Sequence, residues 1–84
     1  MKFIKLTNYK CECGLGNQMV TPTTAYQVGE TDVVIHSRVR TQWIEGKGRW
    51  QASSIQGEHI PIWNCWTRKQ AAKSALWVWF NMNK

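Results

Sequence analysis

The sequence predicts an α+β fold, in which an antiparallel sheet of three or four strands packs against one C-terminal helix. Three observations support this class. Apolar and polar residues alternate along residues 32–45, and this period is typical of a half-buried strand. Turn-forming residues separate this stretch from other short apolar runs, as in a meander. Near the C-terminus, apolar residues recur instead at helical spacing. The 84 residues are long enough for one domain, 1–84.

The N-terminal half begins with two short strand patterns. An apolar run within residues 2–7 predicts a first strand, and residues 25–28 predict a second. Residues 8–24 between them are rich in Gly, Asn, Pro and Thr, which indicates loops and turns.

A hairpin is expected in the middle of the chain. Residues 32–45 and 49–56 flank a Gly-containing turn, and the pattern places Trp43 opposite Trp50 on the core face. This register also pairs Thr41 with Ala52 and Val39 with Ser54. The opposite face of the hairpin is polar and basic, and it carries His36, Arg38, Arg40, Gln42, Arg49, Gln51 and Ser53.

A third meander strand and a helix complete the expected fold. Residues 59–66 predict an edge strand, because Pro61 cannot donate to a ladder. Thr67 and Gln70 have the spacing of a capping box, which predicts a helix from there to about Asn81. The predicted core comprises Trp43, Trp50, Ile62, Trp66, Leu76 and Trp79.

The composition limits the kinds of partner and the location that we expect for the protein. The chain has 11 Lys and Arg against 5 Asp and Glu, a net charge of +6, and 6 Trp. A basic surface of this kind indicates an anionic partner. No stretch has the length of a membrane span or the pattern of a signal peptide, so we expect a cytoplasmic protein with no membrane partner.

The residues do not indicate catalysis. The acidic residues fall mostly in predicted turns, and no carboxylate pair is placed on one element. We expect His36 and His59 to lie on the sheet surface. The sequence therefore favours a non-enzymatic protein with no small-molecule substrate and no cofactor.

Three cysteines raise the question of a metal. Cys11, Cys13 and Cys65, together with one histidine, could form a Cys₃His zinc site. The usual spacing of two to four residues within a cysteine pair is absent. We therefore expect reduced thiols that pack as small hydrophobic side chains, and no metal.

Two surfaces are candidates for binding. Arginine and glutamine are the residue types that read guanine and adenine, so the basic sheet face favours nucleic acid. Cations at the helix start add an anion site. The same alternation also fits an ordinary solvated sheet face. The predicted contacts are Arg38, Arg40, Gln42, Arg49 and Gln51, with Arg68 and Lys69 on phosphates.

The second candidate is a protein interface. Trp63 and Trp77 lie off the predicted core faces, and Trp and Arg are typical interface anchors. The alternative for both tryptophans is burial under the loop of residues 8–24.

Several patterns resemble known families. Residues 32–81, with strands before a helix, resemble plant AP2-type and integrase arm-binding domains, which implies DNA reading by a sheet. Trp50-Gln51-Ala52, Ile60-Pro61-Ile62 and Thr67 with the following helix resemble small podovirus inhibitors of bacterial RNA polymerase. The start Met1-Lys2-Phe3-Ile4-Lys5 is similar to an anti-CRISPR protein.

These resemblances imply a small phage or mobile-element protein in the bacterial host cytoplasm. The expected partner is nucleic acid or a host nucleic-acid-processing complex. The alternative is a protein–protein inhibitor of the anti-CRISPR or RNA polymerase inhibitor type, anchored by exposed Trp and Arg.

Overall fold

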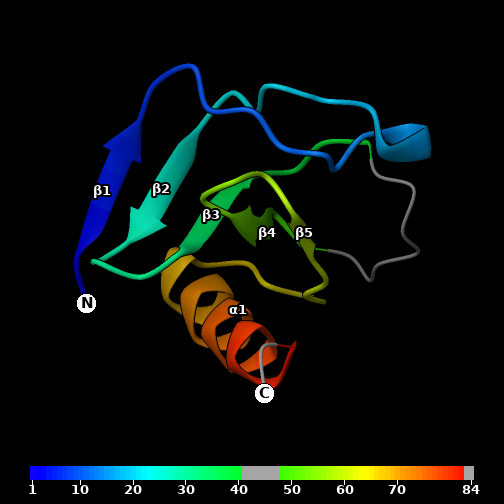
Figure 1. Cartoon of the computed structure of the whole chain (residues 1–84). Coiled ribbons are helices and arrows are strands. Elements are labelled where there is room, and N and C mark those ends of the chain that lie inside the picture. Colours follow the sequence, from blue (N-terminus) through cyan, green and yellow to red (C-terminus); the bar gives the residue numbers. More distant parts are fainter. Residues whose placement is uncertain (41–47, 83–84) are drawn as a thin grey trace.

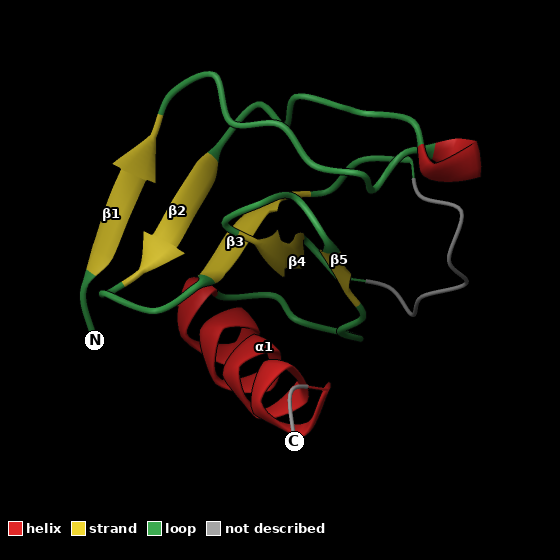
Figure 2. Ribbon diagram, viewed as in Figure 1, coloured by secondary structure: helices red, strands yellow, loops and turns green. Residues whose placement is uncertain are grey.

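The computed structural model describes residues 1–40 and 48–82, which form one antiparallel sheet and one C-terminal helix (Figures 1 and 2). The sheet has five strands in sequence order, so the α+β class is confirmed and the strand count is higher than expected. The elements are β1 (Phe3–Leu6), β2 (Ala25–Val28), β3 (Val33–Ser37), β4 (Trp50–Ser54), β5 (His59–Ile60) and α1 (Arg68–Met82).

The two faces of the sheet have different covers. Helix α1 packs on one face, against β3, β4 and β5 (Figure 1). The segment of residues 7–24, between β1 and β2, covers the other face. Tyr9 Oη lies 2.7 Å from Ser53 Oγ, and Glu12 N–H donates to Gly57 O at 2.7 Å. The central strands are therefore buried on both sides.

The helix-side core is built from isoleucines on the sheet and alanines on α1. Ile35 and Ile60 are fully buried, and they flank Ala52 on the same face. Three buried alanines, Ala71, Ala72 and Ala75, let the helix approach the sheet closely. Each buried isoleucine contributes about 1.5–3 kcal/mol relative to exposure.

The register of β3 and β4 differs from the predicted hairpin. Ile35 pairs with Ala52 and Val33 with Ser54. The residues opposite Ala52 and Ser54 therefore lie six positions earlier in the chain than predicted. Residues 33–36 are all buried, because both faces of β3 are covered. This buried run, and not the alternating residues that follow it, pairs with β4. The shift is even, so β4 residues keep their predicted faces. Trp43 and most of the predicted turn lie outside the described residues.

The predicted core is partly correct. Ile62 is buried, and Trp50, Leu76 and Trp79 are partly buried against the helix-side core. The prediction for Trp66 is wrong, because its side chain is 59% exposed. The chain leaves β5 before Pro61, so Trp66 does not continue the alternation of that strand.

The helix begins as its capping box predicts. Gln70 N–H donates to Thr67 Oγ1 at 3.1 Å, and Thr67 N–H donates to Gln70 Oε1 at 3.3 Å. The predicted strand 59–66 shortens to the two residues of β5, which lies at the sheet edge as expected. Cys65 O still accepts from Arg49 N–H and Trp50 N–H, so the segment before the helix remains beside β4.

Candidate functional site

A polar cleft lies where α1 begins, on the helix side of the sheet. Arg49 comes directly before β4, and Arg68 is the first residue of α1. The fold brings these two predicted binding residues to one cavity of about 370 Å³. Its lining residues are Thr24, Tyr26, Ser37, Arg49, Trp50 and Arg68. We refer to these six residues as the arginine cleft.

Aromatic rings orient both arginines. The Arg68 guanidinium carbon lies 5.1 Å from the centre of the Tyr26 ring and 5.4 Å from that of Phe3. The Arg49 guanidinium carbon lies 6.0 Å from the centre of the Trp50 ring. An arginine stacked in this way keeps its N–H edge available for a ligand. Within residues 1–40 and 48–82, neither guanidinium forms an ion pair with a carboxylate.

Hydroxyl groups add hydrogen-bonding capacity to the cleft. Three of its lining residues, Thr24, Tyr26 and Ser37, carry a hydroxyl group, and Ser37 Oγ accepts a hydrogen bond from Thr24 N–H at 3.2 Å. Phosphate oxygens are bound by arginine and by such hydroxyls. The arginine cleft can therefore hold an anionic group.

Of the other predicted nucleic-acid contacts that the structure describes, none lines the arginine cleft. Arg38 and Arg40 are exposed beyond the end of β3, where Arg38 Nη1 donates to Gly48 O at 3.2 Å. Lys69 is exposed on the first turn of α1 but does not line the arginine cleft. Gln42 lies outside the described residues.

The expectation of an open, basic sheet face is wrong. Gln51 and Ser53 do lie on the face opposite α1, but both are fully buried, and Ser53 lies under Tyr9 of residues 7–24. Gln51 Oε1 accepts a bond from Val39 N–H at 2.7 Å. Alternation separates the two faces of a strand, and it does not distinguish a polar side chain in solvent from one under a loop.

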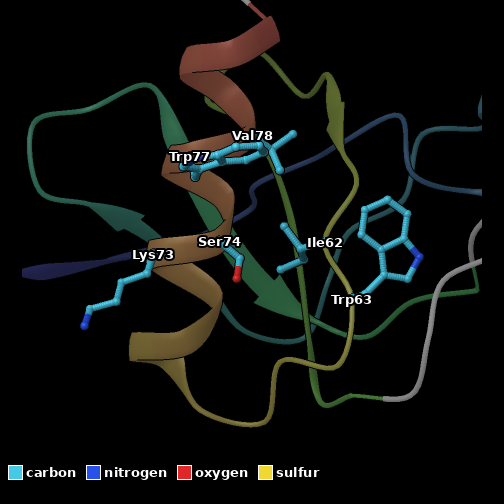
Figure 3. A pocket seen from close by; sticks show the side chains of 6 residues that line it. All are labelled: Ile62, Trp63, Lys73, Ser74, Trp77 and Val78. Atoms are coloured by element: carbon cyan, nitrogen blue, oxygen red, sulfur yellow. The ribbon is translucent and has the colours of Figure 1, made fainter.

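An apolar groove lies between α1 and the segment after β5. Its volume is about 470 Å³, and its lining residues are Ile62, Trp63, Lys73, Ser74, Trp77 and Val78. Figure 3 shows the Trp63 ring on the far side of Ile62 from the helix that carries Trp77. Trp63 is 52% exposed and Trp77 69% exposed, so burial under residues 8–24 is excluded for both. We call this the tryptophan groove.

The surroundings of the tryptophan groove are cationic. Helix α1 carries Arg68, Lys69 and Lys73 and contains no acidic residue. Two further exposed aromatic side chains, Trp66 and Phe80, lie outside the lining of the groove.

A buried cluster of cysteine and histidine side chains lies under residues 7–24, on the sheet face opposite α1. His36 Nε2 is 3.7 Å from both Cys11 Sγ and Cys13 Sγ, and His59 Nδ1 is 3.2 Å from Cys13 Sγ. Both histidines are buried, so the expectation that they lie on the sheet surface is wrong. Cys65 is not part of this cluster. It belongs to the helix-side core, where its thiol donates a hydrogen bond to Ser74 Oγ at 3.7 Å.

The cluster favours a thiolate at Cys11. A hydrogen bond from Cys13, followed by the interaction with His36, holds the pKa of the Cys11 thiol below its ordinary value, against the opposing effect of burial. Burial raises the pKa of the neighbouring Tyr9 above its ordinary value, which keeps the phenol protonated. Cys11, Cys13 and His36 are residues that could hold a metal ion. The sequence signal was the Cys-x-Cys pair, but its histidine partners come from distant strands.

Comparison of the chain with protein-family models, curated proteins and solved structures finds no match. Among the described residues, no helix has the length and apolar character that crossing a membrane requires.

Proposed function

We propose that this protein binds single-stranded nucleic acid in the arginine cleft and acts by binding rather than catalysis. The observation that carries this proposal is the convergence of Arg49 and Arg68 on one cavity with Tyr26 and Trp50. Proteins that bind single strands combine a cationic groove for the backbone with aromatic side chains for the bases. The resemblance to small phage proteins supports a host nucleic-acid-processing complex as the setting.

The net charge of +6 favours a polyanion over a single small anion. Phosphates along a strand release counterions when they bind to lysine and arginine. In the arginine cleft, the guanidinium edges bind phosphate oxygens and the hydroxyls add hydrogen bonds. The Trp50 and Tyr26 rings line the same cavity, and an unpaired base packs beside them.

Fluorescence anisotropy of a labelled single-stranded oligonucleotide, measured over a salt series, tests the proposal. The logarithm of the binding constant falls against the logarithm of salt concentration with a slope of about −0.7 per phosphate contact. Arg49→Ala and Arg68→Ala should each make the slope shallower by about 0.7. Lys10→Ala removes an exposed charge away from the arginine cleft and is the matched control. Absence of binding at low salt overturns the proposal, and preference for duplex excludes the single-strand form.

A second function is favoured by the tryptophan groove. We propose that it docks an acidic protein segment, which inserts an apolar side chain between Trp63 and Trp77 and places carboxylates near the cations of α1. Large exposed apolar side chains grouped on one surface are typical of interaction sites, and tryptophan is the residue type most enriched at interface hot spots.

Matched tryptophan and aromatic variants test the docking function. The readout is capture of one defined partner from bacterial lysate after nuclease treatment. Trp63→Ala and Trp77→Ala should each abolish capture, whereas Trp66→Ala and Phe80→Ala remove exposed aromatics outside the tryptophan groove and should retain it. Equal loss in all four variants contradicts a groove-specific interface. Loss of every captured protein after nuclease treatment would support nucleic-acid binding as the only function.

A further inference from the structure

Three potential metal ligands converge beneath residues 7–24. The ligand atoms of Cys11, Cys13 and His36 all lie within 4.8 Å of one another, and all three residues are buried. They come from separate parts of the fold, because the cysteines precede the short Leu15–Asn17 turn and the histidine is on β3.

The spacing of the atoms matches tetrahedral zinc. Zinc–sulfur bonds of about 2.3 Å and zinc–nitrogen bonds of about 2.0–2.1 Å place sulfur and nitrogen ligands about 3.6 Å apart. Both Sγ–Nε2 distances to His36 are 3.7 Å. An ion at the centre of the three atoms therefore reaches each ligand with little movement of the protein.

The His36 ring is held in the tautomer that zinc requires. Its Nδ1 lies 2.9 Å from the carbonyl oxygen of Ser37. A carbonyl oxygen can only accept, so Nδ1 carries a proton, and a neutral ring that binds a metal would do so through the lone pair of Nε2. Nε2 is the ring nitrogen that faces the two sulfurs. A backbone carbonyl that receives the second ring N–H is the usual outer partner of a metal-bound histidine.

The two cysteines and the residue between them differ in exposure. Cys11 pairs with Val20 through two backbone bonds of 3.0 and 2.9 Å, and the chain bends at Glu12, whose N–H donates to Gly57 O. Cys11 and Cys13 are fully buried, whereas Glu12 is exposed. This backbone path brings both sulfurs to His36 and leaves the Glu12 side chain in solvent.

A fourth donor lies beside Cys13. His59 Nδ1 is 3.2 Å from Cys13 Sγ, but it does not lie within 4.8 Å of all three of the other ligand atoms, so its ring must move toward them to share one ion. We propose that Cys11, Cys13, His36 and His59 bind one Zn²⁺ ion, which joins residues 7–24 to β3 and β5. A structural ion of this kind stabilises a small domain whose core is limited. The site is on the sheet face opposite the arginine cleft, so this inference does not depend on the proposed function.

Metal analysis and cobalt substitution test the site. The full chain, purified under reducing conditions without chelator, should contain one equivalent of zinc by elemental mass spectrometry. Replacement by Co²⁺ should give thiolate-to-cobalt charge-transfer absorption in the near ultraviolet and the visible bands of a tetrahedral ion. This measurement needs no variant, so a folding defect cannot obscure it. A chain without zinc and without thiolate–cobalt absorption overturns the proposal, as does a Cys11–Cys13 disulfide under these conditions.

Variants then assign the ligands. Cys11→Ser, Cys13→Ser and His36→Ala should lose the charge-transfer bands or bind cobalt far more weakly. His59→Ala should weaken binding by at least about tenfold. Cys65→Ser is the matched control, because it replaces a buried cysteine outside the cluster and should retain full zinc. Loss of zinc from Cys65→Ser, with retention in Cys11→Ser, would contradict the assignment.

Discussion

Replacement of Gly57 by alanine should displace the segment that carries the two cysteines. Gly57 has a φ of +99°, and a Cβ there would lie 3.0 Å from Lys10 O and 3.2 Å from Cys11 Cα. Both neighbours are backbone atoms, so residues 10–11 must move away from the sheet. Gly29→Ala is the matched control, because Gly29 also has a positive φ, +56°, but nothing lies within 4 Å of an added Cβ.

The expected losses of stability differ between the two variants. A left-handed conformation costs an L-residue about 1–2 kcal/mol, and this is the whole expected loss in Gly29→Ala. The contacts at Gly57 add about 1–3 kcal/mol, as in overpacked sites. One kcal/mol corresponds to about 4–8 °C in Tm for a domain of this size. Gly57→Ala should therefore unfold at least about 4 °C below Gly29→Ala.

Thermal unfolding followed by circular dichroism, with zinc analysis of the same samples, provides the assay. Gly57→Ala should bind zinc more weakly than the wild type, because Cys11 moves, whereas Gly29→Ala should keep its zinc. Equal Tm values and equal zinc content in the two variants would refute the reasoning that Gly57 holds the cysteine segment against the sheet.

Three further outcomes follow from the fold. A chelator should lower the Tm of the wild type and of Cys65→Ser, since an ion at 100 times its Kd adds about 2.7 kcal/mol of stability; an unchanged Tm counts against a structural ion. Thr67→Ala, which removes the cap of α1, should cost about 0.5–2 kcal/mol in urea unfolding, and no change would show that the helix start is held by tertiary packing. Ile35→Ala should cost about 2–5 kcal/mol, because Ile35 is fully buried between the sheet and α1. A cost below 1 kcal/mol would indicate a loosely packed core.

The local elements were predictable where a short-range signal defines them. The Thr67–Gln70 capping box correctly marks the start of α1, and the apolar run at residues 25–28 correctly predicts β2. These signals depend on neighbours within a few residues. The hairpin register was not predictable in this way, because the buried run at residues 33–36 lacks a polar face that would fix it.

The candidate sites depend on contacts between distant segments. The sequence singled out Arg49 and Arg68 separately, but only the fold places both in one cavity with Tyr26. Likewise, the sequence showed the pair Cys11 and Cys13 but not the histidine beside it. His36 is on β3, and it meets the two cysteines only because residues 7–24 fold over the sheet. That segment has no periodic pattern, so its path over the sheet could not be derived from composition.

The salt dependence of single-stranded oligonucleotide binding by the wild type and by the double variant Arg49→Ala/Arg68→Ala tests the central claim most directly. If both arginines bind phosphates, the double variant should bind more weakly, and its salt slope should be shallower by about 1.4. The same affinity and the same slope in the two proteins, with the double variant folded by circular dichroism, would contradict nucleic-acid binding in the arginine cleft.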